Sequence, residues 1–356
     1  MHIWLRCETK NNEYRTPITP VVAGKLIADG YKITVEKSVT RCFSDQSYLD
    51  IGCILVDAGS WIDAPLDAFI IGLKELPNHV EIIKHRHIYF AHCYKNQNGW
   101  YQIIQKFKKG NGQLFDLEYL TDDTGQRLVA FGVSAGIAGT LLAVQTWCSQ
   151  KELGSNANLG PIKPATSQTK IVHSLKKRLN QLSVPKVIVI GASGRCGTGS
   201  VSVLNQLGII PTKIGRSDND NNSLIQSQLL EHDIVINCIN LTSEIKPFIT
   251  KDMLTNPLRK ITVIVDISCD YSNPFNPIAI YHNSNTFDNP INNIIIDNKH
   301  PLDLIAIDNL PSMLPIESSN DFAIKLYPYL LELNNLTNKS VWRKTLDIYL
   351  EKYNAI

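Results

Sequence analysis

The sequence predicts an α/β protein with two doubly wound domains and a cleft between them. Its 356 residues exceed the size at which one hydrophobic core usually stops growing. Short aliphatic runs alternate with helix-like segments along most of the chain, a pattern typical of parallel sheets covered by helices. One aliphatic run, 186–190, leads directly into a glycine-rich turn at 191–199. Together these observations favour two Rossmann-like domains.

The first domain is expected to begin with a strand over 2–6 and a helix over 19–28 that stops at Gly30. β-Branched and aromatic residues indicate the strands that follow. These expected strands cover 31–36, 53–57, 68–72 and 88–91. Alternation of strands with helices implies a parallel sheet covered on both faces.

The segment 128–150 carries no charged residue, so a membrane span must be weighed against a buried helix. Gly132, Gly136, Gly139 and several hydroxyl and amide side chains interrupt its apolar residues. Small residues suit a helix that packs closely against protein. We therefore expect a buried helix over 132–150, packed between two domains, rather than a membrane span.

The second domain is expected to continue with a loop over 154–168, rich in Gly, Asn, Pro, Ser and Thr, and a helix over 171–182. Its expected strands cover 186–190, 212–215, 233–239, 261–266, 293–296 and 304–307. Two last helices, over 320–333 and 340–352, are expected to return to the first domain. The predicted domains are therefore 1–131 with 325–356, for catalysis on the substrate, and 132–324, for a dinucleotide.

The glycine turn has the spacing Gly191, Gly194, Gly197 after a buried strand. Glycine lets the backbone approach a pyrophosphate closely, and the N-terminus of the following helix stabilises negative charge. Asp218 follows the next expected strand, where a carboxylate accepts hydrogen bonds from ribose hydroxyls and repels a 2′-phosphate. This favours NAD, although Arg216 keeps NADP open because a guanidinium pairs well with phosphate.

Composition excludes several classes of protein. A net charge of +2, from 35 basic and 33 acidic residues, gives no bulk attraction to nucleic acid or anionic lipid. The eight cysteines are scattered without C-x-x-C, disulfide-like or zinc-like spacing, which indicates reduced cytoplasmic thiols and no metal site. The first ten residues carry charges where a signal peptide needs its apolar run.

Two cysteines fall at the expected cofactor site, Cys196 inside the glycine turn and Cys238 at the end of the strand over 233–239. A disulfide between them would obstruct nucleotide binding. The alternative is a pair of small buried thiols, because free cysteine is among the most buried residue types.

Lys74 and His92 each follow an expected strand of the first domain. The carboxyl ends of parallel strands border the ligand crevice of such sheets, so both side chains are expected to point into one cleft. A partly buried lysine and a histidine make an acid and base pair near neutral pH. His85 and His87 lie before the strand over 88–91 and are expected to be solvated.

At these residues the chain resembles the NAD-dependent, L-lysine-forming saccharopine dehydrogenase family, and more distantly alanine dehydrogenase. The resemblance runs nearly from end to end, and its most specific parts are Gly72-Leu-Lys-Glu75 and Phe90-Ala-His-Cys-Tyr-Lys95. The other matching segments are Glu8-Thr-Lys10, Glu13-x-Arg15 with Thr19-Pro20, Ala58-Gly-Ser-Trp61, Asp116-Leu-Glu118, 127–139, Gly194-Arg-Cys-Gly197, Asn237-Cys-Ile239, Asn273-Pro-x-Asn-Pro277 and Asp308-x-Leu-Pro-Ser312. The chain has Asn309 where relatives are expected to carry His.

The resemblance implies a reaction that splits saccharopine with NAD and water into lysine, 2-oxoglutarate and NADH. It implies that Lys74 and His92 are the acid and base groups and that Glu75 and Glu118 tune their charge. The substrate's carboxylates would be held by Arg15, Gln97 and Arg127, with Asp308 near the reacting centre. The residues expected at the cofactor are Gly191, Gly194, Arg195, Cys196, Gly197, Asp218 and Cys238. A monomer is also implied.

Two alternatives remain open from the sequence. One is a related opine or amino-acid dehydrogenase that uses another amine and 2-oxo acid. The other is a dinucleotide-sensing protein that keeps the fold without catalysis, which the joint presence of Lys74, His92, Arg15 and Arg127 disfavours.

Overall fold

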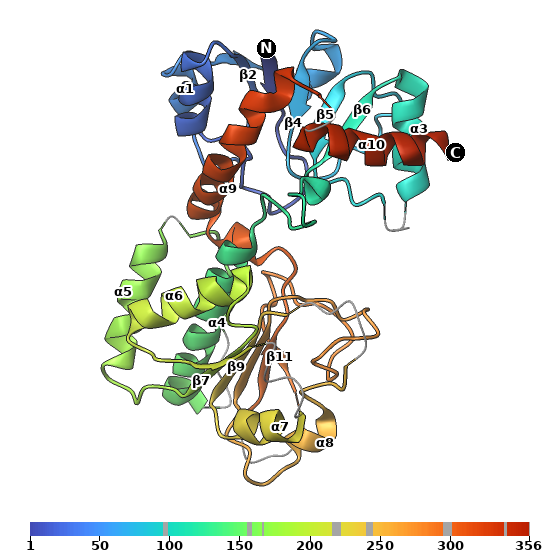
Figure 1. The fold of residues 1–356 in the computed structure, drawn as a ribbon. Coiled ribbons are helices and arrows are strands. Elements are labelled where there is room, and N and C mark those ends of the chain that lie inside the picture. Colours follow the sequence, from blue (N-terminus) through green and yellow to red (C-terminus); the bar gives the residue numbers. More distant parts are fainter. Residues whose placement is uncertain are drawn as a thin grey trace. The chain divides into compact units, whose positions relative to one another are not determined.

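The computed structural model describes residues 1–94, 99–154, 159–165, 167–215, 222–239, 245–294, 301–337 and 340–355 (Figure 1). The chain forms two compact units. Unit 1 comprises Met1–Ala130 and Pro315–Ile356, and unit 2 comprises Phe131–Leu314. The sequence placed the second boundary at 324/325, which falls inside helix α9 (Pro315–Leu330). This helix begins at a proline, which the first turn of a helix tolerates, and it belongs to unit 1 from its first residue.

Unit 1 contains a six-stranded sheet in the order β3-β2-β1-β4-β5-β6, with every neighbouring pair parallel. The strands, in chain order, are β1 (His2–Leu5), β2 (Lys32–Glu36), β3 (Ile54–Val56), β4 (Phe69–Ile71), β5 (Arg86–Tyr89) and β6 (Gln113–Asp116). The direction of winding changes between β1 and β4. The carboxyl ends of these two strands therefore mark the crevice where doubly wound sheets bind ligands.

Helices cover both faces of this sheet (Figure 1). They are α1 (Pro20–Ala28), α2 (Asp45–Leu49), α3 (Trp100–Gly110), α9 and α10 (Val341–Asn354), with 3-10 turns η1 (Ser60–Asp63), η2 (Leu117–Tyr119) and η6 (Leu331–Asn334). Thr19 caps α1, since its side chain accepts the N–H of Val22 and Pro20 sits at the first helical position. Helix α10 packs on β6 through Phe115 and Trp342, whose ring centroids lie 6.1 Å apart.

Unit 2 contains a second six-stranded sheet in the order β11-β12-β10-β9-β7-β8. The strands are β7 (Val187–Ile190), β8 (Thr212–Ile214), β9 (Ile234–Asn237), β10 (Val263–Asp266), β11 (Asn292–Asn293) and β12 (Asp303–Ile305). All pairs are parallel except β11 with β12. The strand expected over 293–296 is thus a two-residue antiparallel edge as far as the described residues show. The winding direction changes between β7 and β9.

Alternate residues of β7 enter two different cores, as expected for a strand buried on both faces. Val187 and Val189 belong to a core under α4 (Gly132–Leu153), α5 (Gln168–Leu179) and α6 (Arg195–Leu207). Ile188 and Ile190 belong to the core on the opposite face, under α7 (Asn222–Leu230) and α8 (Lys251–Leu254).

Helix α4 belongs to unit 2 and packs there against α6 and the sheet. A Cβ atom on Gly136 would lie 1.9 Å from the carbonyl oxygen of Cys196, and one on Gly199 would lie 2.2 Å from that of Val133. The small residues therefore allow the backbones of α4 and α6 to come into direct contact. Within the described parts of the chain, no helix combines the length and apolar character needed to cross a bilayer.

His85 and His87 are not solvated as the sequence suggested; they are 2% and 0% exposed. β5 begins at Arg86, earlier than expected, so His87 lies within the sheet. Its ring packs edge-on against Trp61 of η1 and Phe107 of α3, at centroid distances of 4.9 and 5.6 Å. Aromatic residues that are distant in the chain cover it, and this burial lowers its pKa well below 6.5.

Candidate active site

Four loops of unit 1 meet at the carboxyl edge of its sheet, after β1, β4, β5 and β6. Strand β4 lies beside β5, and the pairing continues past their ends, because the N–H of Phe90 donates to the carbonyl of Leu73 at 3.2 Å. This bond holds the segment before Lys74 next to the segment before His92. The structure therefore brings these two predicted residues to neighbouring strand ends.

His92 has a left-handed backbone, with φ of 51°, which is uncommon for a residue with a side chain. Its ring stacks on Phe90 at an interplanar angle of 20°. Its Nδ1 atom lies 3.4 Å from Oε2 of Glu118, which follows β6. The His92 side chain is 45% exposed and that of Glu118 is 12% exposed, so the ring is accessible to solvent while the carboxylate beside it is largely buried.

The charged side chains at the carboxyl edge of the unit 1 sheet shift one another's pKa values. Burial tends to raise the pKa of Glu75, but its own backbone N–H and the charges of Lys10, Lys74 and His92 outweigh burial and lower it. Burial raises the pKa of Asp116 to about 6, against the opposing charge of His92. Lys74, Glu75, His92 and Glu118 thus share one electrostatic neighbourhood.

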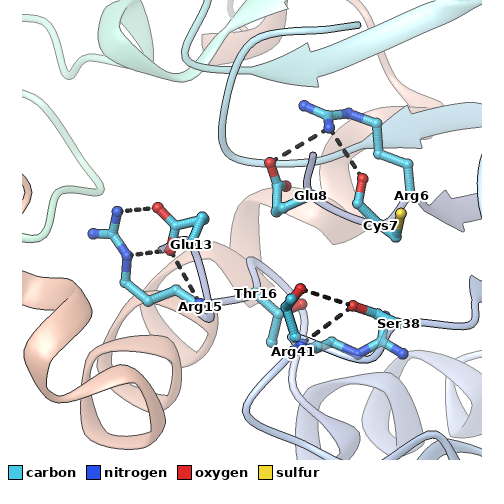
Figure 2. Close-up of a pocket in the computed structure, with 9 residues that line it drawn as sticks. Arg6, Cys7, Glu8, Glu13, Arg15, Thr16, Ser38 and Arg41 are labelled. Atoms are coloured by element: carbon cyan, nitrogen blue, oxygen red, sulfur yellow. Dashed lines mark hydrogen bonds and ion pairs between the residues drawn. The ribbon is translucent and has the colours of Figure 1, made fainter. Parts of the chain in front are cut away.

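Arg15 is buried and pairs with Glu13 through two parallel hydrogen bonds (Figure 2). Its Nε donates to Oε1 of Glu13 at 2.8 Å, and its Nη2 donates to Oε2 at 2.6 Å. Burial opposes ionisation of Glu13, but the charges of Arg15 and Lys74 lower its pKa. The predicted carboxylate-binding arginine is therefore held in a fixed orientation close to Lys74.

The remaining predicted substrate residues do not all belong to unit 1 or to the described part of the chain. Arg127 lies on an exposed turn that pairs back on Thr121, and its charge acts on Tyr119. Asp308 is in unit 2, exposed after β12, where its charge helps burial to raise the pKa of Cys269. Gln97, predicted to bind substrate, and Asp218, predicted to bind the cofactor ribose, both lie outside the described residues.

The glycine turn of unit 2 follows β7, at the switch point of its sheet. Gly191 has φ of 76°, and a Cβ there would lie 2.3 Å from Cγ2 of Ile239. A Cβ on Gly197 would lie 2.2 Å from the carbonyl oxygen of Gly191. Gly194 caps α6, which begins at Arg195. The turn therefore excludes side chains at two of its positions and presents a helix N-terminus, as a pyrophosphate cradle requires.

Cys196 and Cys238 are both free thiols. Cys196 lies in the first turn of α6, and Sγ of Cys238 lies 3.5 Å from Oγ of Ser200 on the same helix. Burial raises the pKa of the Cys238 thiol. Both side chains are partly exposed, so the disulfide and the pair of small buried thiols both stay predictions.

Comparisons with known proteins assign both halves of the chain to one family. The family model of the alanine dehydrogenase/PNT N-terminal domain matches residues 4–138, and that of the C-terminal domain matches residues 200–349. A saccharopine dehydrogenase [NAD(+), L-lysine-forming] of Emericella nidulans is 42% identical over 98% of this chain and 96% of its own length. The protein of the same description from Schizosaccharomyces pombe is 43% identical over 98% and 97%.

The chain belongs to the L-lysine-forming saccharopine dehydrogenase family. Among solved structures, an L-alanine dehydrogenase superposes with a TM-score of 0.70 at 14% identity, covering 98% of this chain and 94% of that one. A transhydrogenase from Sinorhizobium meliloti superposes with a TM-score of 0.65 at 16% identity, covering 93% of each. These likenesses confirm two Rossmann-like domains for this member of the saccharopine dehydrogenase family.

Two groups at the sheet edges of this saccharopine dehydrogenase family member were not predicted as site residues. In unit 1 they are Arg6 and Glu8, which follow β1 and bond to the backbone around Lys74. In unit 2, Asp266 accepts hydrogen bonds from Asn237, Ser268 and Tyr281 at 2.9, 2.6 and 2.6 Å. Their signal in the sequence is only that Arg6 directly follows an apolar run, with Glu8 two residues later, and that Asp266 ends one.

Proposed function

We propose that this chain catalyses the reversible reaction saccharopine + NAD⁺ + H₂O → L-lysine + 2-oxoglutarate + NADH + H⁺. The observation that carries the proposal is the placement of Lys74 and His92 at neighbouring strand ends, with Glu75 and Glu118 beside them. Membership of the saccharopine dehydrogenase family supports the choice of substrate. In this proposal the enzyme performs the last step of the aminoadipate route of lysine biosynthesis.

The residues of unit 2 fit a dinucleotide. The turn can keep its close backbone packing only with glycine at Gly191 and Gly197, where a Cβ atom would collide with neighbouring backbone or side-chain atoms, and it leads into the N-terminus of α6. Gly194, Arg195, Cys196 and Cys238 border the same turn, and Asp218 is proposed for the ribose. When bound, NAD supplies a hydride acceptor. We propose unit 2 as the NAD domain and unit 1 as the substrate domain.

Proton transfers are the task of Lys74 and His92. Hydride leaves the carbon next to the secondary amine of saccharopine, and that nitrogen must first be deprotonated. Water then adds to the resulting imine, and the departing lysine nitrogen needs a proton. One of these two side chains accepts the amine proton, and the other activates water and donates a proton to the leaving nitrogen. Glu75 and Glu118 adjust the charge of both.

The three carboxylates of saccharopine need cationic partners. Arg15 is proposed for one of them, because Glu13 fixes the plane of its guanidinium and planar pairing with a carboxylate is directional. Arg127, Gln97 and Asp308 are the further proposed substrate residues. We also propose that the enzyme works as a monomer in the cytoplasm, which the scattered free cysteines support.

The activity is tested by following NADH oxidation with 2-oxoglutarate and lysine, and then with alanine, ornithine or ammonia in place of lysine. Turnover with lysine is expected. Turnover only with another amine would replace the proposal by a related opine or amino-acid dehydrogenase. Measurable NADH binding without turnover of any amine would favour a dinucleotide sensor. NADPH in place of NADH tests the cofactor preference.

Substitution of either acid-base residue provides the first prediction. Lys74→Met and His92→Gln are each expected to lower kcat by about 10² to 10⁴-fold, the usual contribution of a positioned acid or base. Binding of NADH, measured by fluorescence titration, is expected to stay within about twofold because neither residue belongs to unit 2. Unchanged kcat in either variant would remove that residue from the mechanism.

A further inference from the structure

The ends of β1 and β4 meet where the winding of the unit 1 sheet changes direction. Leu5 pairs with Ile71 in parallel register, and the N–H of Arg6 donates to the carbonyl of Ile71 at 3.0 Å. The residues that follow these ends, Arg6 to Glu8 on one side and Gly72 to Lys74 on the other, are consequently adjacent. This is the crevice in which a ligand binds in doubly wound sheets.

Glu8 holds the main chain that leads into Lys74. Its Oε1 accepts the N–H of Leu73 at 2.6 Å, and its Oε2 accepts the N–H of Lys74 at 3.0 Å. The Glu8 side chain is 6% exposed. Burial raises its pKa, against the opposing charge of Arg6 and the two backbone hydrogen bonds.

Arg6 holds the same residue from its other end. Its Nη2 donates to the carbonyl of Lys74. Its Nη1 donates to Oε2 of Glu8 at 3.4 Å and to the carbonyl of Cys7 at 3.3 Å (Figure 2). The Arg6 side chain is 1% exposed. Lys74 is therefore fixed at both its N–H and its carbonyl by one buried ion pair.

Gly72 leaves room for the Arg6 guanidinium because it has no side chain. A Cβ at Gly72 would lie 2.4 Å from both Cζ and Nε of Arg6, much closer than two carbon atoms or a carbon and a nitrogen can approach. The glycine that precedes Leu73-Lys74 in the sequence is thus explained by the guanidinium that lies against it. The small pocket lined by Arg6, Glu8 and Arg15 has a volume of about 10 Å³, room for about one water molecule, so the pair is shielded from solvent.

We propose that Arg6 and Glu8 are positioning residues that act on the reaction through Lys74. The inference rests on the proposed function, in which Lys74 transfers a proton. A lysine side chain has many rotamers, and a displacement of about 1 Å at a reacting group costs on the order of 10²-fold in rate. Fixing the Lys74 backbone on both sides limits where its Nζ can lie.

Two variants disturb the pair in different ways. Glu8→Gln keeps the shape but replaces one acceptor oxygen by an N–H₂ donor that faces a backbone N–H. Gly72→Ala keeps every charge and displaces the Arg6 guanidinium. The matched control is Glu36→Gln, because Glu36 is also fully buried and accepts the N–H groups of Cys7, Gly59 and Trp61 at 2.9, 2.9 and 2.7 Å, without touching Leu73 or Lys74.

Each variant is made in the wild-type and in the Lys74→Met background, and kcat, KM for saccharopine and NADH binding are measured. Glu8→Gln and Gly72→Ala are expected to lower kcat by roughly 10²-fold in the wild type and by less than about threefold in the Lys74→Met background, because residues acting as one unit are not additive. The pH dependence of kcat is expected to change only for these two variants. Glu36→Gln is expected to lower Tm and to have the same small effect on kcat in both backgrounds.

The outcomes separate the two proposals. If Glu8→Gln lowers the residual rate of Lys74→Met by its full wild-type factor, or behaves as Glu36→Gln does, the positioning role is overturned while the proposed function stands. If Lys74→Met itself keeps the wild-type kcat, Lys74 leaves the mechanism and the positioning role falls with it, while the proposed function stands. No turnover of saccharopine by the wild-type protein would overturn the proposed function. Circular dichroism establishes that each variant is folded, and Gly72→Ala carries the test if Glu8→Gln does not fold.

Discussion

Asp116 combines full burial with an incomplete set of hydrogen bonds. Its Oδ1 accepts the N–H of Glu118 at 2.9 Å, whereas its Oδ2 has no hydrogen-bond partner within the described residues. Burial raises its pKa from 3.8 to about 6, and the charge of Glu118 adds to burial. Asp116 ends β6 two residues before Glu118, and the charges of both Glu118 and His92 act on it.

This shift has a defined sign for stability. Between pH 3.8 and about pH 6 the folded chain keeps the Asp116 proton while the unfolded chain releases it, so stability decreases as pH rises through this interval. Asp116→Asn removes the effect. The free energy of unfolding of this variant relative to wild type, measured in urea, is expected to rise between pH 4 and pH 7 by on the order of 3 kcal/mol. A difference that does not depend on pH would show that Asp116 ionises normally.

Single residues differ in how far the sequence reveals their surroundings. The placement of Lys74 and His92 at neighbouring strand ends was predictable because each directly follows an apolar run of the sheet. The burial of His87 was not predictable, since it depends on Trp61 and Phe107 reaching it from distant elements. Glu8 was not predictable as a partner of Lys74, because no local pattern states that β1 lies beside β4.

Among the elements, the contact between α4 and α6 depends most directly on glycine. Gly136→Ala would place a methyl group 1.9 Å from the carbonyl oxygen of Cys196, so the two helices would have to separate. We expect a loss of about 3 kcal/mol or more in the free energy of unfolding, at the upper end for overpacked cores. Thermal unfolding of the variant measures it.

Gly24 is the matched control for this prediction. It also lies inside a helix, α1, but a Cβ there would meet only Cδ1 of Ile51 at 3.9 Å, an ordinary van der Waals contact. Gly24→Ala is expected to stabilise the protein by about 0.5 to 1 kcal/mol, because alanine loses less backbone entropy in a helix. Equal effects at Gly24 and Gly136 would contradict the role of close packing.

The elements themselves were predictable where periodicity was strong. Apart from β6, the strands of both sheets were expected within a few residues of their bounds, and α4 was expected from its uncharged run of small residues over 132–150. Helix α3 and strand β6 were not expected. Helix α3 follows the Phe90-Ala-His-Cys-Tyr-Lys95 segment, and β6 is a strand of only four residues that ends at Asp116. The start of α9 was predicted too late in the chain, because a proline such as Pro315 occurs both in loops and at the first position of a helix.

At the scale of the whole molecule, two units with separate sheets are expected to respond separately to perturbation. NADH at 100 times its Kd adds about 2.7 kcal/mol to the stability of the unit that binds it. Differential scanning calorimetry is expected to show NADH raising the transition that Gly136→Ala lowers, that of unit 2. Glu36→Gln is expected to lower the other transition. A single transition that shifts equally under all three changes would contradict this independence.

The fold class was predictable from the sequence, because short aliphatic runs typical of strands alternate with helix-like segments along the chain. Which strands become neighbours did not follow, since the sheet order is set by packing between distant segments.

The bond between Glu8 and Lys74 joins residues that are 66 positions apart, and it forms only when β1 has paired with β4. Long-range pairing of this kind is slow compared with the formation of helices and turns. During refolding, the glycine turn and α6 form from residues that are close in the chain. The backbone of Lys74 is fixed only after the long-range pairing of β1 with β4 in the other sheet. The ability to hold a dinucleotide is therefore expected to return earlier in time than the ability to turn it over.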